Sequence, residues 1–196
     1  MATNPPIEEI QACVKTLREG GLILYPTDTV WGIGCDAVNN EAVNKIFSLK
    51  KREAGKSMLI LASDINMVSR YVMGLPEIAV ELFDNATTPL TLILPEAVNL
   101  ARDVPASDQS VGIRIPHDAF CLEVLKTFRR PIVSTSANFS GEPSPSWFGE
   151  INPVLIEKMD FVVKWKREDH SRHLPSSIIR INTDGSFRII RLGGAN

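Results

Sequence analysis

The stretch IEEIQACVKTLREGGLILY, residues 7–25, indicates the fold class. Its first part, Ile7–Arg18, repeats apolar side chains at intervals of three and four residues, which predicts a helix with one apolar face. The glycine pair that follows is a typical helix end. The four residues Leu22–Tyr25 then predict a buried strand. A helix that leads directly into a buried strand favours an α/β protein.

The same alternation continues to the end of the chain. Further helices are predicted at Glu41–Lys50, capped by Asn39 or Asn40, at Asp118–Phe128, and as short segments opened by Asp64, Pro76 and Asn152–Pro153. Further strands are predicted at Met58–Leu61, Leu90–Leu94, Val111–Ile115, Pro131–Val133, Ser177–Ile181 and Phe187–Leu192. The last two strands flank an Asp-Gly pair and alternate with period two, as in an antiparallel hairpin. This order predicts an α/β fold with a mixed sheet.

Length and composition favour a single domain that comprises residues 1–196. The 44% hydrophobic and 22% charged residues are ordinary for a globular protein, and no apolar run approaches the ~20 residues that span a bilayer. The N-terminus lacks the pattern of a secretion signal. Three widely spaced cysteines, Cys13, Cys35 and Cys121, suit a reducing compartment, so we expect a cytoplasmic protein without a membrane partner. The net charge of −2 does not indicate bulk nucleic-acid binding.

Three short motifs resemble known sites but lack the required context. Gly55–Ser57 resembles the end of a P-loop, yet the glycine needed five positions earlier is Lys50. Gly32–Ala37 fits the dinucleotide pattern G-x-G-x-x-A, but it does not follow its strand directly, so a glycine-rich loop bending toward a pocket is favoured. His170 and His173 lie in a charged stretch without further ligands at zinc-site spacing, which favours a solvated loop and no metal site.

Three other segments place small polar or basic side chains at predicted strand ends. Tyr25–Gly32 brings two threonines and a carboxylate into a loop, and Lys50–Ser57 belongs to a basic run that suits phosphate oxygens. Ser134–Asn138 supplies hydroxyls that can hydrogen-bond a sugar, a phosphate or an amino acid. Arg114 and Arg191 are further anion-binding candidates. Taken singly, these features could instead be a solvated helix end, a serine-rich turn and surface ion pairs. Taken together, the segments favour a polyanionic ligand with hydroxyls, such as a nucleotide or RNA.

Four motifs, in order, resemble the YrdC/Sua5 family of threonylcarbamoyl-AMP synthases. They are Pro26–Gly32, Lys50-x-Arg52 with Lys56, Gly112–Pro116 and Ser134–Gly141. The resemblance covers nearly the whole chain. It implies a single-domain, twisted mixed sheet flanked by helices, with a concave, positively charged cleft. It also implies that L-threonine, bicarbonate and ATP, with Mg²⁺ bridging the phosphates, form threonylcarbamoyl-AMP and pyrophosphate. The product would serve the modification of tRNA adenosine 37.

The resemblance also implies a role for individual residues. The catalytic set would be Lys50, Arg52, Ser136 and Asn138. The residues that contact ATP would be Arg52, Lys56, Ser110, Ser136, Ser144 and Arg191. The residues that contact threonine would be Thr29, Arg114, Ser134 and Ser176. Arg114 would clamp the α-carboxylate of threonine as a fork. The chain departs from the family pattern at Leu61, where histidine is usual, and at Trp31, where tyrosine is usual. Two further departures are Thr87–Thr91 and Pro175–Ser177.

Two other functions remain open at this point. One is a non-catalytic module that binds double-stranded RNA or tRNA, which the basic run from Lys45 to Lys56 supports and the net charge opposes. The other is a carbamoyl-adenylating activity on a different acceptor, as in hydrogenase-maturation proteins. If the chain is a synthase, we expect it to hand its labile product to the enzyme that transfers the threonylcarbamoyl group to tRNA.

Overall fold

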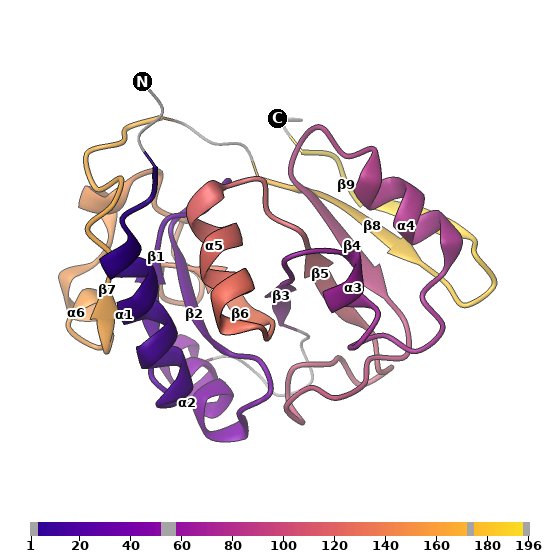
Figure 1. The fold of residues 1–196 in the computed structure, drawn as a ribbon, viewed down its shortest axis with the longest axis horizontal. Helices are drawn as coiled ribbons and strands as arrows, with labels where there is room; N and C mark the ends of the chain where they lie inside the picture. The colour runs from indigo at the N-terminus through magenta and orange to yellow at the C-terminus, as the bar shows by residue number, and fades with distance from the viewer. Residues whose placement is uncertain (1–3, 52–57, 172–174, 194–196) are drawn as a thin grey trace.

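Within the residues that the structure describes, nine strands pair into one mixed sheet. The structure, a computed structural model, describes residues 4–51, 58–171 and 175–193. The strands are β1 (Ile23–Tyr25), β2 (Gly32–Asp36), β3 (Leu59–Leu61), β4 (Leu90–Leu94), β5 (Val111–Arg114), β6 (Ile132–Ser136), β7 (Phe161–Val162), β8 (Ser177–Ile181) and β9 (Phe187–Arg191). They lie in the order β7-β1-β2-β6-β3-β5-β4-β8-β9 (Figure 1). Three of these pairs are parallel and five antiparallel, which confirms the predicted mixed sheet.

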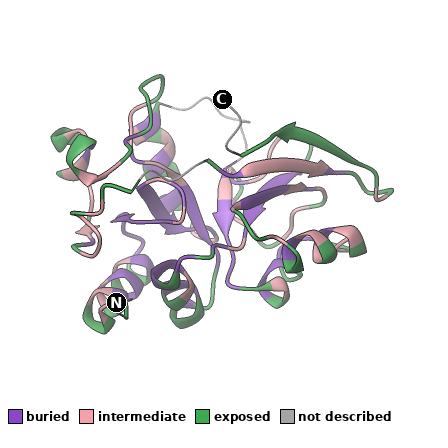
Figure 2. Cartoon of the chain, turned by 90° about the horizontal axis from the view of Figure 1, so that it is seen from above, coloured by how far each residue is buried: buried purple, intermediate pink, exposed green. Residues whose placement is uncertain are grey.

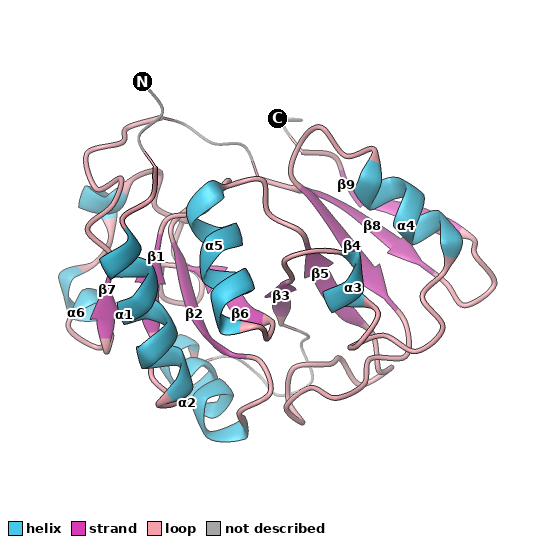
Figure 3. Cartoon of the chain, viewed as in Figure 1, coloured by secondary structure: helices cyan, strands magenta, loops and turns pink. Residues whose placement is uncertain are grey.

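The helices begin where the sequence predicts them. They are α1 (Ile7–Arg18), α2 (Asn40–Lys50), α3 (Ile65–Val68), α4 (Glu77–Asp84), α5 (Ala119–Phe128) and α6 (Pro153–Ile156), with a 3₁₀ turn at Phe148–Glu150 (Figure 3). Four N-cap side chains accept a hydrogen bond from the first turn of their helix: Asn39, Asp64, Asp118 and Asn152. Each cap satisfies a main-chain N–H that would otherwise have no partner inside the helix. The proposed Asn39 cap of α2 is therefore confirmed over Asn40.

Helices cover the sheet unequally. Figures 1 and 2 show α1 and α5 together on one face, in front of β1, β2 and β6. Helix α2 packs beside β2. The central strands β2 and β5 are buried along their whole length, so the core lies between the middle of the sheet and its helices. Among the described residues, none of the helices has the length and apolar character needed to span a bilayer.

The predicted loop at Gly32–Ala37 is wrong, because Gly32–Asp36 forms β2. This strand lies between β1 and β6, with Gly34 beside Ile23 of β1 and Ser134 of β6. A Cβ atom on Gly34 would lie 2.8 Å from the Tyr25 ring and 2.9 Å from the side chain of Ile132. Glycine is required at this point because neighbouring side chains occupy the space above it. The strand β7 also has no counterpart in the prediction.

The hydroxyl-rich segment after the predicted strand Pro131–Val133 is also not a loop. Strand β6 continues through Ser134, Thr135 and Ser136. These three residues pair with Gly34, Ile33 and Gly32 of β2, respectively. The Ser134 Oγ atom lies 3.2 Å from the place a Cβ on Gly32 would take. Gly32 therefore leaves room for the Ser134 hydroxyl within the sheet, and β6 fixes the position of that hydroxyl.

Candidate functional site

A polar cavity of about 370 Å³ lies beside the end of β6. Its walls come from the loop Thr27–Val30, from β6, from the segment before β8 and from the end of β9. A more open hollow of about 810 Å³ lies beside α2 and is lined in part by Lys45, Lys51 and Lys158. None of the predicted site residues that the structure describes lines this hollow. The smaller cavity is therefore the candidate site.

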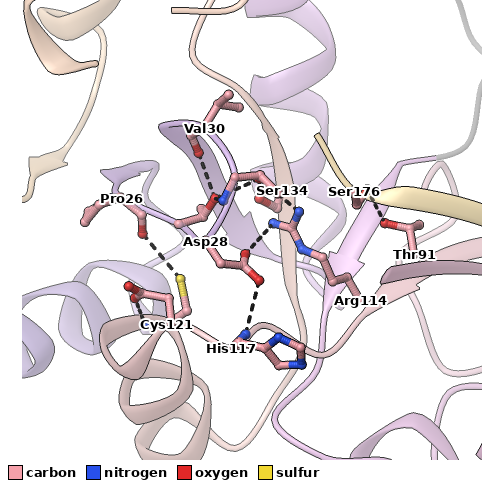
Figure 4. Close-up of polar contacts among 12 residues, drawn as sticks. Pro26, Asp28, Val30, Thr91, Arg114, His117, Cys121, Ser134 and Ser176 are labelled. Carbon is pink, nitrogen blue, oxygen red and sulfur yellow. Dashed lines mark hydrogen bonds and ion pairs between the residues drawn. The ribbon is translucent and has the colours of Figure 1, made fainter. Parts of the chain in front are cut away.

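A buried arginine forms part of the cavity wall. Arg114 ends β5, and its side chain is only 4% exposed. One terminal nitrogen (Nη1) donates to the Thr29 hydroxyl at 2.9 Å, and the other (Nη2) lies 3.4 Å from the Asp28 carboxylate (Figure 4). The second oxygen of Asp28 accepts the His117 main-chain N–H at 3.1 Å. The loop carboxylate therefore anchors the guanidinium to the segment that follows β5.

This arrangement leaves two buried polar atoms without a hydrogen bond. They are the Nε of Arg114 and the Oδ1 of Asp28. A buried donor without a partner costs free energy, about 1–3 kcal/mol for a neutral group and more for a charged one. A carboxylate or phosphate oxygen that reaches the guanidinium would remove part of this cost. A planar guanidinium is also the side chain best suited to bind a carboxylate through two parallel hydrogen bonds.

Serine hydroxyls stand on both sides of Arg114. The Tyr25 phenol donates to Ser134 Oγ at 2.9 Å, and burial raises the pKa of Tyr25 so far that the phenol stays protonated. On the other side, Ser176 Oγ lies 2.9 Å from the Thr91 hydroxyl. Arg191 donates to the main-chain oxygen of Ser176 through Nη2 at 2.8 Å and through Nε at 3.2 Å. Both serines are thus held in place by buried or charged neighbours.

Lys50 orders the turn that follows β6. Its ammonium donates to the main-chain oxygens of Ser136, at 2.8 Å, and Asn138, and to the Asn138 side-chain oxygen at 3.1 Å. Ser136 Oγ donates to that same side-chain oxygen. The residue Lys50 is 5% exposed. Three members of the predicted catalytic set are therefore in mutual contact, and Lys50 braces the two others.

The structure brings most of the predicted site residues together. Seven of them line the cavity: Thr29, Arg114, Ser134, Ser136, Ser144, Ser176 and Arg191. Lys50 and Asn138 contact Ser136 but do not line the cavity themselves. Ser110 is buried at the start of β5 and donates to the Asp108 carboxylate at 2.6 Å, away from the lining. Arg52 and Lys56 fall outside the described residues. The roles assigned to all of these side chains remain predictions.

Two departures from the family pattern lie close to the site. Leu61 is fully buried in β3, where it pairs with Arg114, and it does not line the cavity. Trp31 packs edge-on against Phe148, with ring centroids 4.9 Å apart. Pro175 and Ser176, in contrast, line the cavity directly. Of these departures, Pro175 therefore forms part of the cavity wall, whereas Leu61 and Trp31 do not.

The cysteines are buried rather than poised for reaction. Cys13, Cys35 and Cys121 are free thiols. Burial raises the pKa of Cys13 to about 12, and it raises the pKa values of the other two as well. Such thiols stay protonated at neutral pH, and the thiolate is the nucleophilic form. In the part of the chain that the structure describes, no three His, Cys, Asp or Glu side chains gather as a metal site.

Four further residues of the site carry no individual role in the sequence analysis. Thr27 lines the cavity and contacts Thr29, while Asp28, Tyr25 and Thr91 contact Arg114, Ser134 and Ser176, respectively. The loop that carries Thr27 and Asp28 was recognised as polar. Asp28, in the loop after β1, meets Arg114, at the end of β5, only in the assembled sheet, where β2, β6 and β3 lie between those two strands. No local pattern encodes this contact.

The fold and the cavity define a class: a mixed α/β protein with a cavity lined by an arginine and by serine and threonine hydroxyls. Residues 15–193 match the profile of the Sua5/YciO/YrdC family, whose description is "Telomere recombination", and the chain belongs to this family. The threonylcarbamoyl-AMP synthase of Stenotrophomonas maltophilia is 34% identical over 158 residues, which is 79% of this chain and 84% of that relative. The family predicted from the four motifs is therefore confirmed.

Solved structures agree with this assignment. Sua5 of P. abyssi, complexed with L-threonine, superposes with a TM-score of 0.85 at 29% identity. The match covers 98% of this chain but only 56% of that Sua5 chain. Full-length HypF in a phosphate- and nucleotide-bound form gives a TM-score of 0.78 at 26% identity, over 96% of this chain and 29% of HypF. The predicted fold class is confirmed by these similarities.

Proposed function

We propose that this protein is a threonylcarbamoyl-AMP synthase, a nucleotidyltransferase that forms threonylcarbamoyl-AMP and pyrophosphate from L-threonine, bicarbonate and ATP. The observation that carries the proposal is the buried Arg114, whose Nε has no partner and whose neighbours are serine and threonine hydroxyls. This is a site for one carboxylate next to hydrogen-bonding groups, as an amino acid requires. The similarity to proteins named threonylcarbamoyl-AMP synthase supports the same conclusion.

In the proposed reaction the substrates supply the nucleophile. Threonine and bicarbonate form N-carboxy-threonine, whose new carboxylate attacks the α-phosphorus of ATP as pyrophosphate leaves. The protein then has to orient the reactants and to stabilise developing negative charge. Arg114 holds the α-carboxylate, with Thr29, Ser134 and Ser176 around it. The turn braced by Lys50 presents Ser136 to the reacting groups.

The nucleotide would occupy the side of the cavity formed by Ser136, Ser144 and Arg191, with Arg52 and Lys56 as further phosphate contacts. Mg²⁺ would enter with ATP, because it is usually held by substrate phosphates and few carboxylates at such sites. It would supply charge neutralisation on the phosphates. We propose further that the protein acts in the cytoplasm and passes its product to the enzyme that modifies tRNA.

We favour this function over an RNA-binding module because the site's central cation is buried. Contacts to a nucleic-acid backbone use cations that an extended phosphate chain can reach. Arg114 sits in a cavity of about 370 Å³, which suits a small molecule.

The deciding experiment is pyrophosphate release from Mg-ATP, with L-threonine and bicarbonate each omitted in turn. We expect release only when both are present. Release that needs bicarbonate but shows no preference for threonine would point to another amine substrate. A folded protein that binds ATP or RNA and releases no pyrophosphate under any condition would overturn the proposal.

A further inference from the structure

The hydrogen bonds of the Thr27–Val30 loop have a fixed direction. Thr27 Oγ1 lies 2.8 Å from the main-chain oxygen of Val30, and it also accepts the main-chain N–H of Thr29 at 3.0 Å (Figure 4). A carbonyl oxygen only accepts, so the single hydroxyl proton of Thr27 is donated to Val30. The two threonine hydroxyls are 3.0 Å apart. Since Thr27 has no second proton, Thr29 must be the donor in that contact.

The direction of this bond determines what Thr29 can offer a ligand. Its hydroxyl proton is used on Thr27, and its oxygen accepts from Arg114 at 2.9 Å. A hydroxyl has one proton and two lone pairs, so the capacity left to Thr29 is that of an acceptor. Ser134 has the opposite polarity, because its oxygen accepts from Tyr25 and its own proton is left to donate. The two hydroxyls therefore present unlike groups to the cavity.

Ligand chemistry follows from these polarities. A carboxylate on the Arg114 guanidinium places the α-substituent of the ligand close to the Thr29 hydroxyl, which touches the same guanidinium. An amine or carbamate N–H at that place can donate to Thr29. A keto oxygen at the same place can only accept a hydrogen bond, so it would face a lone pair of the Thr29 oxygen with no proton between them.

We propose that Thr27 is a positioning residue that fixes Thr29 as a hydrogen-bond acceptor, so that the site selects an α-amino acid over the α-keto acid with the same carbon skeleton. The inference rests on the proposed function for the presence of an amino-acid substrate. Thr27 acts through Thr29, whose hydroxyl it orients. A site built for one hydrogen-bond polarity rejects the opposite polarity because its own group is then left unpaired.

The test measures equilibrium binding of two probes, L-2-aminobutyrate and 2-oxobutyrate, to the full chain by calorimetry. We expect the wild-type protein to bind the amino acid at least about tenfold more tightly. Thr27→Val removes the acceptor for the Thr29 proton, which can then turn toward the ligand, and the preference should fall to about threefold or less. Thr27→Ser keeps the hydroxyl, so it should show the wild-type preference for the amino acid. A merely structural role would weaken both probes equally and leave their ratio unchanged.

A third probe tests the same inference on the wild-type protein, in case Thr27→Val does not fold. L-2-hydroxybutyrate carries a hydroxyl that can donate, so it should bind more tightly than 2-oxobutyrate. Equal or tighter binding of the keto acid by the wild type would overturn the inference, and so would an unchanged ratio in folded Thr27→Val. Pyrophosphate release by the wild type with L-threonine is measured separately. It distinguishes a failure of this inference from a failure of the proposed function.

Discussion

Replacing Lys50 by methionine tests whether this side chain holds the turn after β6 together. The substitution keeps an unbranched stem of similar length and removes the ammonium. Three acceptors then each lose the hydrogen bond from Lys50: the main-chain oxygens of Ser136 and Asn138 and the Asn138 side-chain oxygen. The Ser136 main-chain oxygen keeps the N–H of Asn138, and the Asn138 side-chain oxygen keeps the Ser136 hydroxyl. A hydrogen bond to a charged group contributes about 1.5–3 kcal/mol, but water at the cavity edge can replace part of this. We expect a loss of about 3 kcal/mol from the free energy of unfolding.

That loss would be a large share of the roughly 5–15 kcal/mol that stabilises a typical domain. It is measured by urea unfolding with linear extrapolation, since a constant slope would show that the unfolded state is unchanged. Lys45→Met is the matched control on the same helix. Lys45 donates a hydrogen bond of 2.8 Å to the main-chain oxygen of Gly20, and the residue is exposed. The control should lose about 1 kcal/mol or less.

Activity separates bracing from direct substrate contact. If Lys50 positions Ser136 and Asn138, pyrophosphate release should fall by about a hundredfold or more together with the stability. If the free energies of unfolding of Lys50→Met and Lys45→Met agree within about 0.5 kcal/mol, Lys50 does not brace the turn and the argument is refuted. A loss of activity without a loss of stability would then assign Lys50 to the substrate alone.

Three further predictions concern the sheet, the arginine and the acid limit of stability. Gly34→Ala should lower the free energy of unfolding by about 1–3 kcal/mol, because its Cβ would lie 2.8 Å from the Tyr25 ring. Gly112→Ala, whose Cβ would have no contact closer than 3.7 Å, should lower it less in the same urea assay. Arg114→Lys loses the planar fork, so the KM for L-threonine in pyrophosphate release should rise about tenfold or more while kcat changes less. The hydroxyl of Ser110, followed by Arg180, lowers the pKa of Asp108 from 3.8 to about 2. This carboxylate therefore adds stability above pH 3.8 that is lost as the pH falls toward 2, and Asp108→Asn should flatten that part of an acid unfolding curve.

The helices could be predicted because their signals are local. Asn39 accepts the N–H of Ala42, three residues on, and Asp118 accepts the N–H of Cys121 in the same way. Cap and first turn lie within a few residues, so the sequence contains both partners side by side. The spacing in α1 also predicts the burial of Ile10, Val14 and Leu17, although Ile7, in the same predicted stripe, is exposed at the first position of the helix.

Strand β2 could not be predicted in this way. Strand β2 begins with Gly32 and includes Gly34, and glycine is depleted in strands. Its place is decided by Tyr25 on β1 and Ile132 on β6, whose side chains fill the space where Cβ atoms would lie. The same holds for Asp28 and Arg114, which meet only after the sheet has assembled. Neither contact has a local signature.

The glycines that concealed β2 from the sequence also help to build the site. Because Gly34 has no side chain, the Tyr25 ring can lie across β2, and its hydroxyl reaches Ser134 on the next strand. Because Gly32 has none, the Ser134 hydroxyl has room beside the cavity that both residues line. A larger residue at either place would displace a group that the proposed reaction needs. Low strand propensity at these positions is therefore the local cost of placing polar groups inside a sheet, and the buried neighbours on β1 and β6 offset it.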